Sequence, residues 1–133
     1  MIVFIDTNIL ISSALNVGST PYRAFIKAVT FPNRGIVCEQ NIEELYRIFD
    51  KKFPVKKPLL DQFLTLSRNV IEVVPTPIKE NKEENKIRDI KDRPILRAAI
   101  NANADILLTG DKDFLESGIV KPKIMTASQF LNM

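Results

Sequence analysis

Short apolar runs alternate along the chain with segments whose apolar residues recur at helical spacing. The runs at residues 2–5, 36–38, 70–74 and 106–108 have the length and β-branched content of strands, and residues 124–125 fit a fifth strand at a sheet edge. The first run, IVFI, is continuously apolar, which is typical of a strand buried on both faces of a parallel sheet.

Helices are predicted between these strands. Thr20 followed by Pro21 is typical of an N-cap and a first helical turn, and Asp92 before Pro94 has the same pattern. Thr126 is followed three residues later by a glutamine, which is the capping-box pattern of a short last helix. The predicted helical segments are residues 9–15, 20–29, 42–49, 59–67, 92–100 and 126–131.

Residues 79–91 carry charges of both signs and almost no apolar side chains, which predicts a solvated loop. Strands that alternate with helices imply right-handed βαβ units and a parallel sheet covered on both sides. We therefore predict one α/β domain over residues 1–133, a three-layer α/β/α sandwich with a central parallel sheet of four to five strands. In such a sheet, ligands bind at the carboxyl ends of the strands, near the point where the strand order reverses.

The composition narrows the chemistry that is available. The chain has no histidine, which excludes Ser-His-Asp and Cys-His triads and every histidine-based zinc or haem site. Cys38 is the one cysteine, so neither an internal disulfide nor a CxxC zinc site can form, and a reducing compartment is expected. Because the sequence shows no basic leader and no long apolar run, we expect a soluble cytoplasmic protein without membrane association.

Carboxylates from four segments lie near the predicted carboxyl edge of the sheet. They follow the first strand, lie in the first turns of the helix after the second strand, begin the helix before the fourth strand, and follow the fourth strand. In chain order they are Asp6, Glu43, Glu44, Asp92, Asp111 and Asp113. Like charges gathered in this way repel one another, which favours a hard divalent cation such as Mg²⁺ or Mn²⁺. Spacing alone does not choose between the two adjacent glutamates, because both flank the apolar stripe of their helix.

Each acid also has an ordinary structural explanation. Asp6 could end its strand in an Asx turn, and Asp92 could simply cap its helix. The glutamate pair could favour the positive end of a helix, and Gly110 before Asp111 is a turn signal. The argument for a site therefore depends on the convergence of these acids at one edge.

The charge distribution favours a polyanionic partner. The formal net charge of the chain is +3. If five of these acids, counting only Glu44 of the two glutamates, lie in one pocket, the remaining surface carries about +8, which suits binding to phosphates. One local basic cluster fits either such a contact or a solvated helix end. It consists of Arg47, Lys51, Lys52, Lys56 and Lys57.

Three stretches carry a resemblance to a known family. IDTNILISSAL, NIEELYRIF and DRPILRAAINANADILLTGDKDFL, in this order and separation, resemble the PIN-domain family, and within it the toxin-like proteins of bacterial and archaeal toxin–antitoxin pairs. The resemblance implies a small α/β/α sandwich that, in active members, is a metal-dependent ribonuclease. Cys38 departs from the family pattern, because a small hydroxyl residue is expected at this position about as often as not. This departure affects the capping of the next helix more than it affects the chemistry of the site.

Residue by residue, the resemblance implies four catalytic, metal-binding acids with an auxiliary set around them. The four acids are Asp6, Glu44, Asp92 and Asp111, and the auxiliary residues are Thr7, Asn8, Thr109 and Asp113. Glu44 is preferred over Glu43 because the family's acid is usually followed by an apolar residue such as Leu45.

The implied reaction is hydrolysis of RNA phosphodiester bonds, with one or two Mg²⁺ or Mn²⁺ ions lowering the pKa of a bound water. The implied partners are the RNA substrate and a cognate antitoxin protein. Dimerisation is common in the family, although no feature of this sequence marks it. Two alternatives stay open: a catalytically silent PIN-like module that binds RNA or protein, and a Mg²⁺-dependent phospho-acceptor or phosphatase domain. The latter is disfavoured because position 8 is asparagine, where such sites need a second acid.

Overall fold

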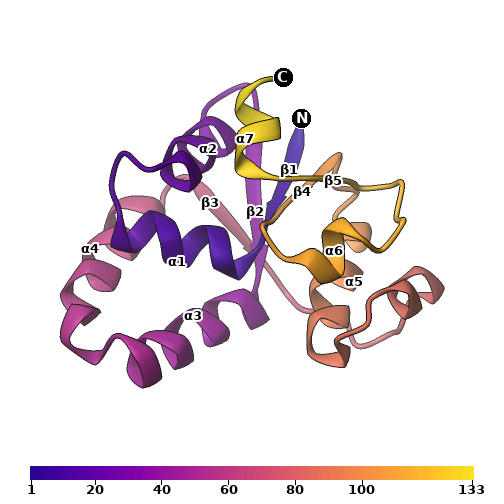
Figure 1. Ribbon diagram of the computed structural model, residues 1–133, viewed down its shortest axis with the longest axis horizontal. Coiled ribbons are helices and arrows are strands. Elements are labelled where there is room, and N and C mark those ends of the chain that lie inside the picture. The colour runs from indigo at the N-terminus through magenta and orange to yellow at the C-terminus, as the bar shows by residue number, and fades with distance from the viewer.

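A five-stranded parallel sheet between two layers of helices makes up the computed structural model, which describes all residues 1–133 (Figure 1). The strands are β1 (Ile2–Ile5), β2 (Arg34–Cys38), β3 (Ile71–Val74), β4 (Ile106–Leu108) and β5 (Lys123–Met125). Their order across the sheet is β3-β2-β1-β4-β5, and every neighbouring pair is parallel. The predicted three-layer α/β/α fold is confirmed, including the fifth strand at an edge.

The helices divide unequally between the two faces of the sheet. They are α1 (Thr7–Leu15), α2 (Thr20–Val29), α3 (Glu39–Lys52), α4 (Lys57–Ser67), α5 (Arg93–Asn101), α6 (Lys112–Leu115) and α7 (Ala127–Leu131), with short 3₁₀ turns at Pro54–Lys56, Lys82–Lys86 and Ile90–Asp92. The first four helices and α7 cover one face, whereas α5 and α6 cover the other (Figure 1). None of these helices is both long and apolar enough to cross a membrane.

The central strand β1 contributes to both hydrophobic cores. Val3 and Ile5 belong to a cluster of 18 buried residues beneath the larger helical layer, and Phe4 belongs to a cluster of 12 beneath α5 and α6. All three side chains are fully buried, as the continuously apolar run predicted. The alternation of side chains along the strand is what directs successive residues to opposite cores.

The chain reverses its direction of travel across the sheet at β1. From β1 it proceeds outward through β2 to β3, and it then crosses back to add β4 and β5 on the other side of β1. The carboxyl ends of β1 and β4 are therefore neighbours at this reversal, and the backbone N–H of Asp6 donates to the carbonyl of Leu108 at 3.0 Å. Such a reversal is the usual ligand-binding position in an open α/β sheet.

One predicted helix cap is wrong, and a second is right in position but lacks the capping hydrogen bond. Ser19, one residue before the predicted Thr20, is the N-cap of α2, and its hydroxyl accepts from the N–H of Tyr22 at 3.3 Å. Asp92 is the N-cap residue of α5, as predicted, but its backbone is helical as the last residue of a 3₁₀ turn and its side chain makes no capping hydrogen bond. The capping box of Thr126 and Gln129 is confirmed, with reciprocal hydrogen bonds of 2.9 and 3.2 Å.

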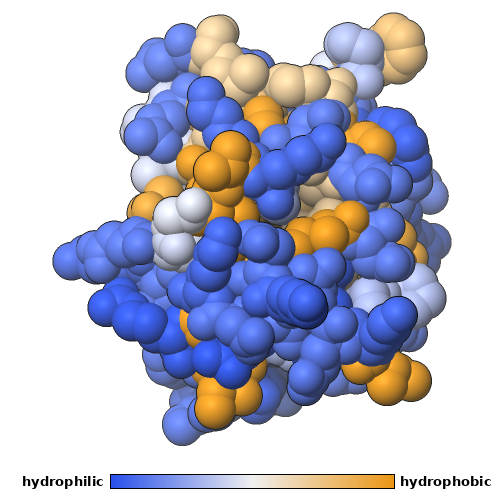
Figure 2. Space-filling model, turned by 90° about the vertical axis from the view of Figure 1, so that its right-hand side faces the viewer, coloured by the Kyte–Doolittle hydropathy of each residue, from blue (hydrophilic) through white to orange (hydrophobic).

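The charged segment 79–91 is only partly the solvated loop that its composition predicts. Glu84 is 3% exposed and Ile87 is fully buried, although the other charged side chains of the segment are exposed. Arg97 of α5 donates to both carboxylate oxygens of Glu84, at 2.7 and 2.9 Å, and to the carbonyl of Pro77 at 2.8 Å. A charge run thus conceals a buried ion pair, while the side of the molecule that carries α5, α6 and this segment remains mostly hydrophilic (Figure 2).

Replacing Arg97 by methionine should destabilise the fold, because the Glu84 carboxylate would stay buried without its cation. We expect the free energy of unfolding to fall by about 3 kcal/mol, measured by urea denaturation. The matched control is Lys86→Met, since Lys86 pairs with Glu83 at 2.7 Å where both side chains are about half exposed, and the expected loss is under about 1 kcal/mol. Equal effects of the two substitutions would contradict a special role for the buried pair.

Candidate metal centre

Asp6 lies at the carboxyl end of β1 and is 6% exposed. It is the N-cap of α1, so that Oδ1 accepts from the N–H of Thr7 at 2.8 Å, and Oδ2 accepts from the hydroxyl of Thr109 at 2.7 Å. Burial raises the pKa of Asp6 to about 6, although both hydrogen bonds act in the opposite direction, and the nearby Glu44 and Asp111 raise it further. The carboxylate is therefore fixed in orientation while its charge is poorly compensated.

The end of β4 supplies the next part of the site. The Thr109 hydroxyl that donates to Asp6 also accepts from the N–H of Asp111 at 3.0 Å. Asp111 in turn caps α6, accepting from the N–H of Asp113 at 2.9 Å, so that a short helix begins directly after the turn that Gly110 marks. On the other side, the N–H of Gly110 donates to Oδ1 of Asn8 at 3.3 Å. These contacts tie the ends of β1 and β4 together.

Asp92 reaches the same site from the segment before α5. Burial raises the pKa of Asp92 to about 8, with further contributions from repulsion by Asp111 and Asp6 and from a hydrogen bond shared with Asp111. Although Asp92 is the N-cap residue of α5, its half-buried carboxylate makes no hydrogen bond to the N-terminus of that helix. The carboxylates of this site repel one another, and binding of a proton or a cation would reduce this repulsion.

The structure distinguishes the two adjacent glutamates of α3. Glu44 is half-buried, acts electrostatically on Asp6, and accepts a hydrogen bond from the side-chain amide of Gln40 at 3.0 Å. Glu43 is exposed and does not act on Asp6. Both line a cleft of about 540 Å³ between α3 and the segment before α5, together with Gln40, Arg47, Asp89, Lys91, Asp92 and Pro94.

Two polar residues of α3 that support the acids were not predicted from the sequence. Asn41 is fully buried, and its amide donates to the hydroxyl of Thr7 at 3.0 Å while its oxygen accepts from the N–H of Cys38 at 2.8 Å. The sequence signal that could have identified Asn41 is its position three residues after the end of a strand, where an asparagine side chain can bond to the backbone at the start of a helix. The only sequence signal for Gln40 is that it lies four residues before Glu44, a spacing at which side chains on a helix are neighbours.

The most compact acidic group differs from the predicted quartet. Carboxylate oxygens of Asp89, Asp92 and Asp113 lie within 4.8 Å of one another, and no three of the four predicted acids lie as close. Arg88 forms an ion pair with Asp113 at 2.8 Å, which partly neutralises this group. Asp92 therefore belongs to both sets, and Asp89 was not predicted. The donors are all hard oxygens, which fit a divalent cation such as Mg²⁺ or Mn²⁺.

The predicted basic cluster is only partly directed toward the acids. Arg47 lines the cleft, and Lys91 lines it from the other side. Lys57 is instead paired with Asp50 at 2.7 Å. Two exposed cations thus flank the acidic site, which is the layout expected of a pocket that receives a phosphate.

A family model and several solved structures match this chain. A comparison with curated proteins gives no match. The crystal structure of VapBC2 from Rickettsia felis, bound to a DNA fragment from its promoter, is similar, with a TM-score of 0.68 and 21% identity over 95% of this chain and 98% of that one. Mycobacterium tuberculosis VapC20, a Sarcin-Ricin loop cleaving toxin, gives a TM-score of 0.61 and 14% identity over 90% and 97% of the two chains. At these identities the likeness shows the fold alone. The family model of the PIN domain matches residues 2–113, and the chain therefore belongs to the PIN-domain family.

Proposed function

We propose that this chain is a single PIN-like domain over residues 1–133 that acts as a metal-dependent endoribonuclease, hydrolysing RNA phosphodiester bonds with Mg²⁺ or Mn²⁺. The observation that carries the proposal is the buried carboxylate of Asp6, held at a raised pKa of about 6 where the strand order reverses. Glu44, Asp111 and Asp92 all lie within its electrostatic reach. Gathered carboxylates that repel one another are stabilised by a hard divalent cation.

The roles of the side chains follow from their contacts. Asp6 and Asp111 would be the central ligands, because the adjacent strand ends and the Thr109 hydroxyl fix them relative to each other. Glu44 and Asp92 would complete the ligand set or hold waters around it. When bound, a divalent cation lowers the pKa of a coordinated water and stabilises the charge that develops on the leaving oxygen. The chain needs no histidine for this chemistry.

Thr7 and Asn8 would act by holding the ligands in place. The hydroxyl of Thr7 accepts from Asn41, which connects the turn after β1 to α3, and Asn8 accepts from the backbone after β4. Asp113 would have an auxiliary role at the margin, where its partner is Arg88. Arg47 and Lys91, on the rim of the cleft, would contact RNA phosphates.

We further propose that the protein is the toxin of a toxin–antitoxin pair and acts in the cytoplasm. Support comes from the two similar structures, of which one is a VapBC2 complex and the other is described as a cleaving toxin. A cognate antitoxin would inhibit by covering the acidic site, and a basic side chain would suit the charge there.

Replacing Asp6 by asparagine should abolish RNA cleavage while leaving the fold intact. We expect at least about a 100-fold lower rate, because charge stabilisation worth several kcal/mol is lost at the metal. The measurement is cleavage of defined single-stranded RNAs with Mn²⁺, with and without a chelator. Asp61→Asn, on the exposed surface of α4, is the matched control and should retain full activity. Full activity of the Asp6 variant would contradict the assignment, and RNA binding without cleavage by the wild type would favour the silent module.

The stability of the metal-free protein should fall as the pH rises from about 5 to about 8. Asp6 and Asp92 bind protons more tightly in the folded chain, at pKa values of about 6 and about 8, than in the unfolded chain at about 3.9. Their stabilising contribution is complete below about pH 4 and is lost as the pH passes through about 6 and then about 8. Mn²⁺ replaces these protons, so its effect on the melting temperature should be larger at pH 8 than at pH 5. An equal effect at both pH values would contradict binding at these acids.

Expression of the protein in a bacterial host should arrest growth if it is a toxin. Co-expression of the product of an adjacent gene should relieve the arrest, because the antitoxin would block the acidic site. The Asp6→Asn variant serves as the control and should be harmless at equal expression. Harmless expression of a wild-type protein that cleaves RNA in vitro would count against the toxin role while leaving the nuclease intact.

A further inference from the structure

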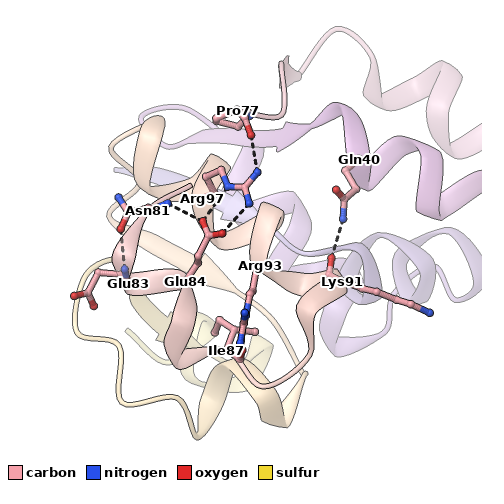
Figure 3. Close-up of polar contacts among 9 residues, drawn as sticks. All are labelled: Gln40, Pro77, Asn81, Glu83, Glu84, Ile87, Lys91, Arg93 and Arg97. Atoms are coloured by element: carbon pink, nitrogen blue, oxygen red, sulfur yellow. Dashed lines mark hydrogen bonds and ion pairs between the residues drawn. The ribbon is translucent and has the colours of Figure 1, made fainter. Parts of the chain in front are cut away.

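Gln40 occupies a junction between three segments of the candidate site. It is the second residue of α3, is half-buried, and lines the cleft beside Glu44, Lys91 and Asp92. Its side-chain amide donates to Oε1 of Glu44 at 3.0 Å. The same amide donates to the carbonyl of Lys91 at 2.9 Å (Figure 3). Its backbone N–H donates to the hydroxyl of Thr76 at 3.1 Å. One residue thus connects α3 with the residue before segment 77–92 and with the end of that segment.

The segment 77–92 is held differently on its two sides. On the side of α5, Arg97 binds Glu84 and Pro77, and the guanidinium of Arg93 donates to the carbonyl of Ile87 at 3.0 Å (Figure 3). On the side of α3, the contact of Gln40 with Lys91 is the only hydrogen bond between that helix and the segment. Because Lys91 directly precedes Asp92, this contact fixes the peptide that carries the Asp92 carboxylate.

A primary amide is suited to this position because it offers two N–H donors and carries no charge. One donor orients the Glu44 carboxylate, and the other holds a backbone carbonyl. Glu44 forms no ion pair, so its negative charge stays available to a cation. A lysine or arginine in place of Gln40 would hold the same acceptors but would cancel that charge.

We propose that Gln40 is a positioning residue that sets the separation and orientation of Glu44 and Asp92 across the site. The inference rests on the proposed metal-dependent function. Gln40 contacts neither cation nor substrate in this account. It acts through the carboxylate of Glu44 and through the Lys91 carbonyl, as outer hydrogen-bonding partners of metal ligands generally do.

The test replaces Gln40 by methionine, which has a similar length and no donors. We expect the affinity of the purified, RNA-free protein for Mn²⁺, measured by titration calorimetry, to fall at least about tenfold. Gln62→Met is the matched control, since Gln62 is exposed on α4 and makes no side-chain hydrogen bond, and its Mn²⁺ affinity should equal that of the wild type. Gln40→Asn, whose amide is too short to span both acceptors, should also weaken Mn²⁺ binding and serves if the methionine variant does not fold.

A purely structural role would be recognised by other measurements. For a positioning role, the urea midpoint of Gln40→Met should stay close to that of the wild type, while kcat for RNA cleavage falls and KM for RNA is unchanged. A folded Gln40→Met protein with wild-type Mn²⁺ affinity and kcat would overturn the inference while the proposed function stands. A wild-type protein that binds Mn²⁺ but cleaves no RNA would contradict the proposed function, and the difference in Mn²⁺ affinity would still decide the role of Gln40.

Discussion

A strand at the centre of a parallel sheet ends where water has little access, and β1 places the carboxylate of Asp6 there. Val3, Phe4 and Ile5 are fully buried, so the residue that follows them is drawn out of water as well. The N-terminus of α1 and the hydroxyl of Thr109 supply hydrogen bonds, yet the pKa of Asp6 remains raised. Desolvation therefore outweighs the two hydrogen bonds, and the fold retains a negative charge at the reversal of strand order that its own dipoles do not compensate.

The partners of the acids are mostly neutral, and this determines what the site can bind. Glu44 is oriented by the amide of Gln40, and Asp6 by the hydroxyl of Thr109 and a backbone N–H. The same chain shows the opposite case at Glu84, whose buried carboxylate is held by Arg97 and has a lowered pKa. A guanidinium cancels the charge that it orients, whereas a neutral donor leaves that charge available to an incoming cation. The carboxylates that we propose as metal ligands thus differ from the structural carboxylate of Glu84 in the charge of their partners.

The sequence predicted the features that follow from strand pattern and topology. Continuous apolar runs indicate a parallel sheet, and the carboxyl-edge rule then brings Asp6 and Asp111 together without knowledge of any contact. The spacing of residues in the sequence could not show which of Glu43 and Glu44 faces the other acids, because this depends on the rotation of α3 against the sheet. Local propensity placed the helix cap correctly at Asp92, but it did not show that a 3₁₀ turn runs into this residue and leaves its side chain without a capping hydrogen bond. The burial of Glu84 could not be predicted from the sequence, because its partner Arg97 lies on another element, outside the charged segment.

The two halves of the acidic site are positioned by different kinds of structure. Asp6 and Asp111 follow paired strands, so the register of the sheet fixes their separation. Asp89 and Asp92 lie on a segment outside the sheet, and side-chain hydrogen bonds to α5 and α3 hold that segment in place. Asp92 lies close to the Asp89–Asp113 pair, and its pKa is raised to about 8 first by burial and then by repulsion from Asp111, Asp6 and Asp89. Asp92 therefore depends for its position on the polar contacts of segment 77–92, whereas Asp6 and Asp111 depend on the pairing of β1 with β4.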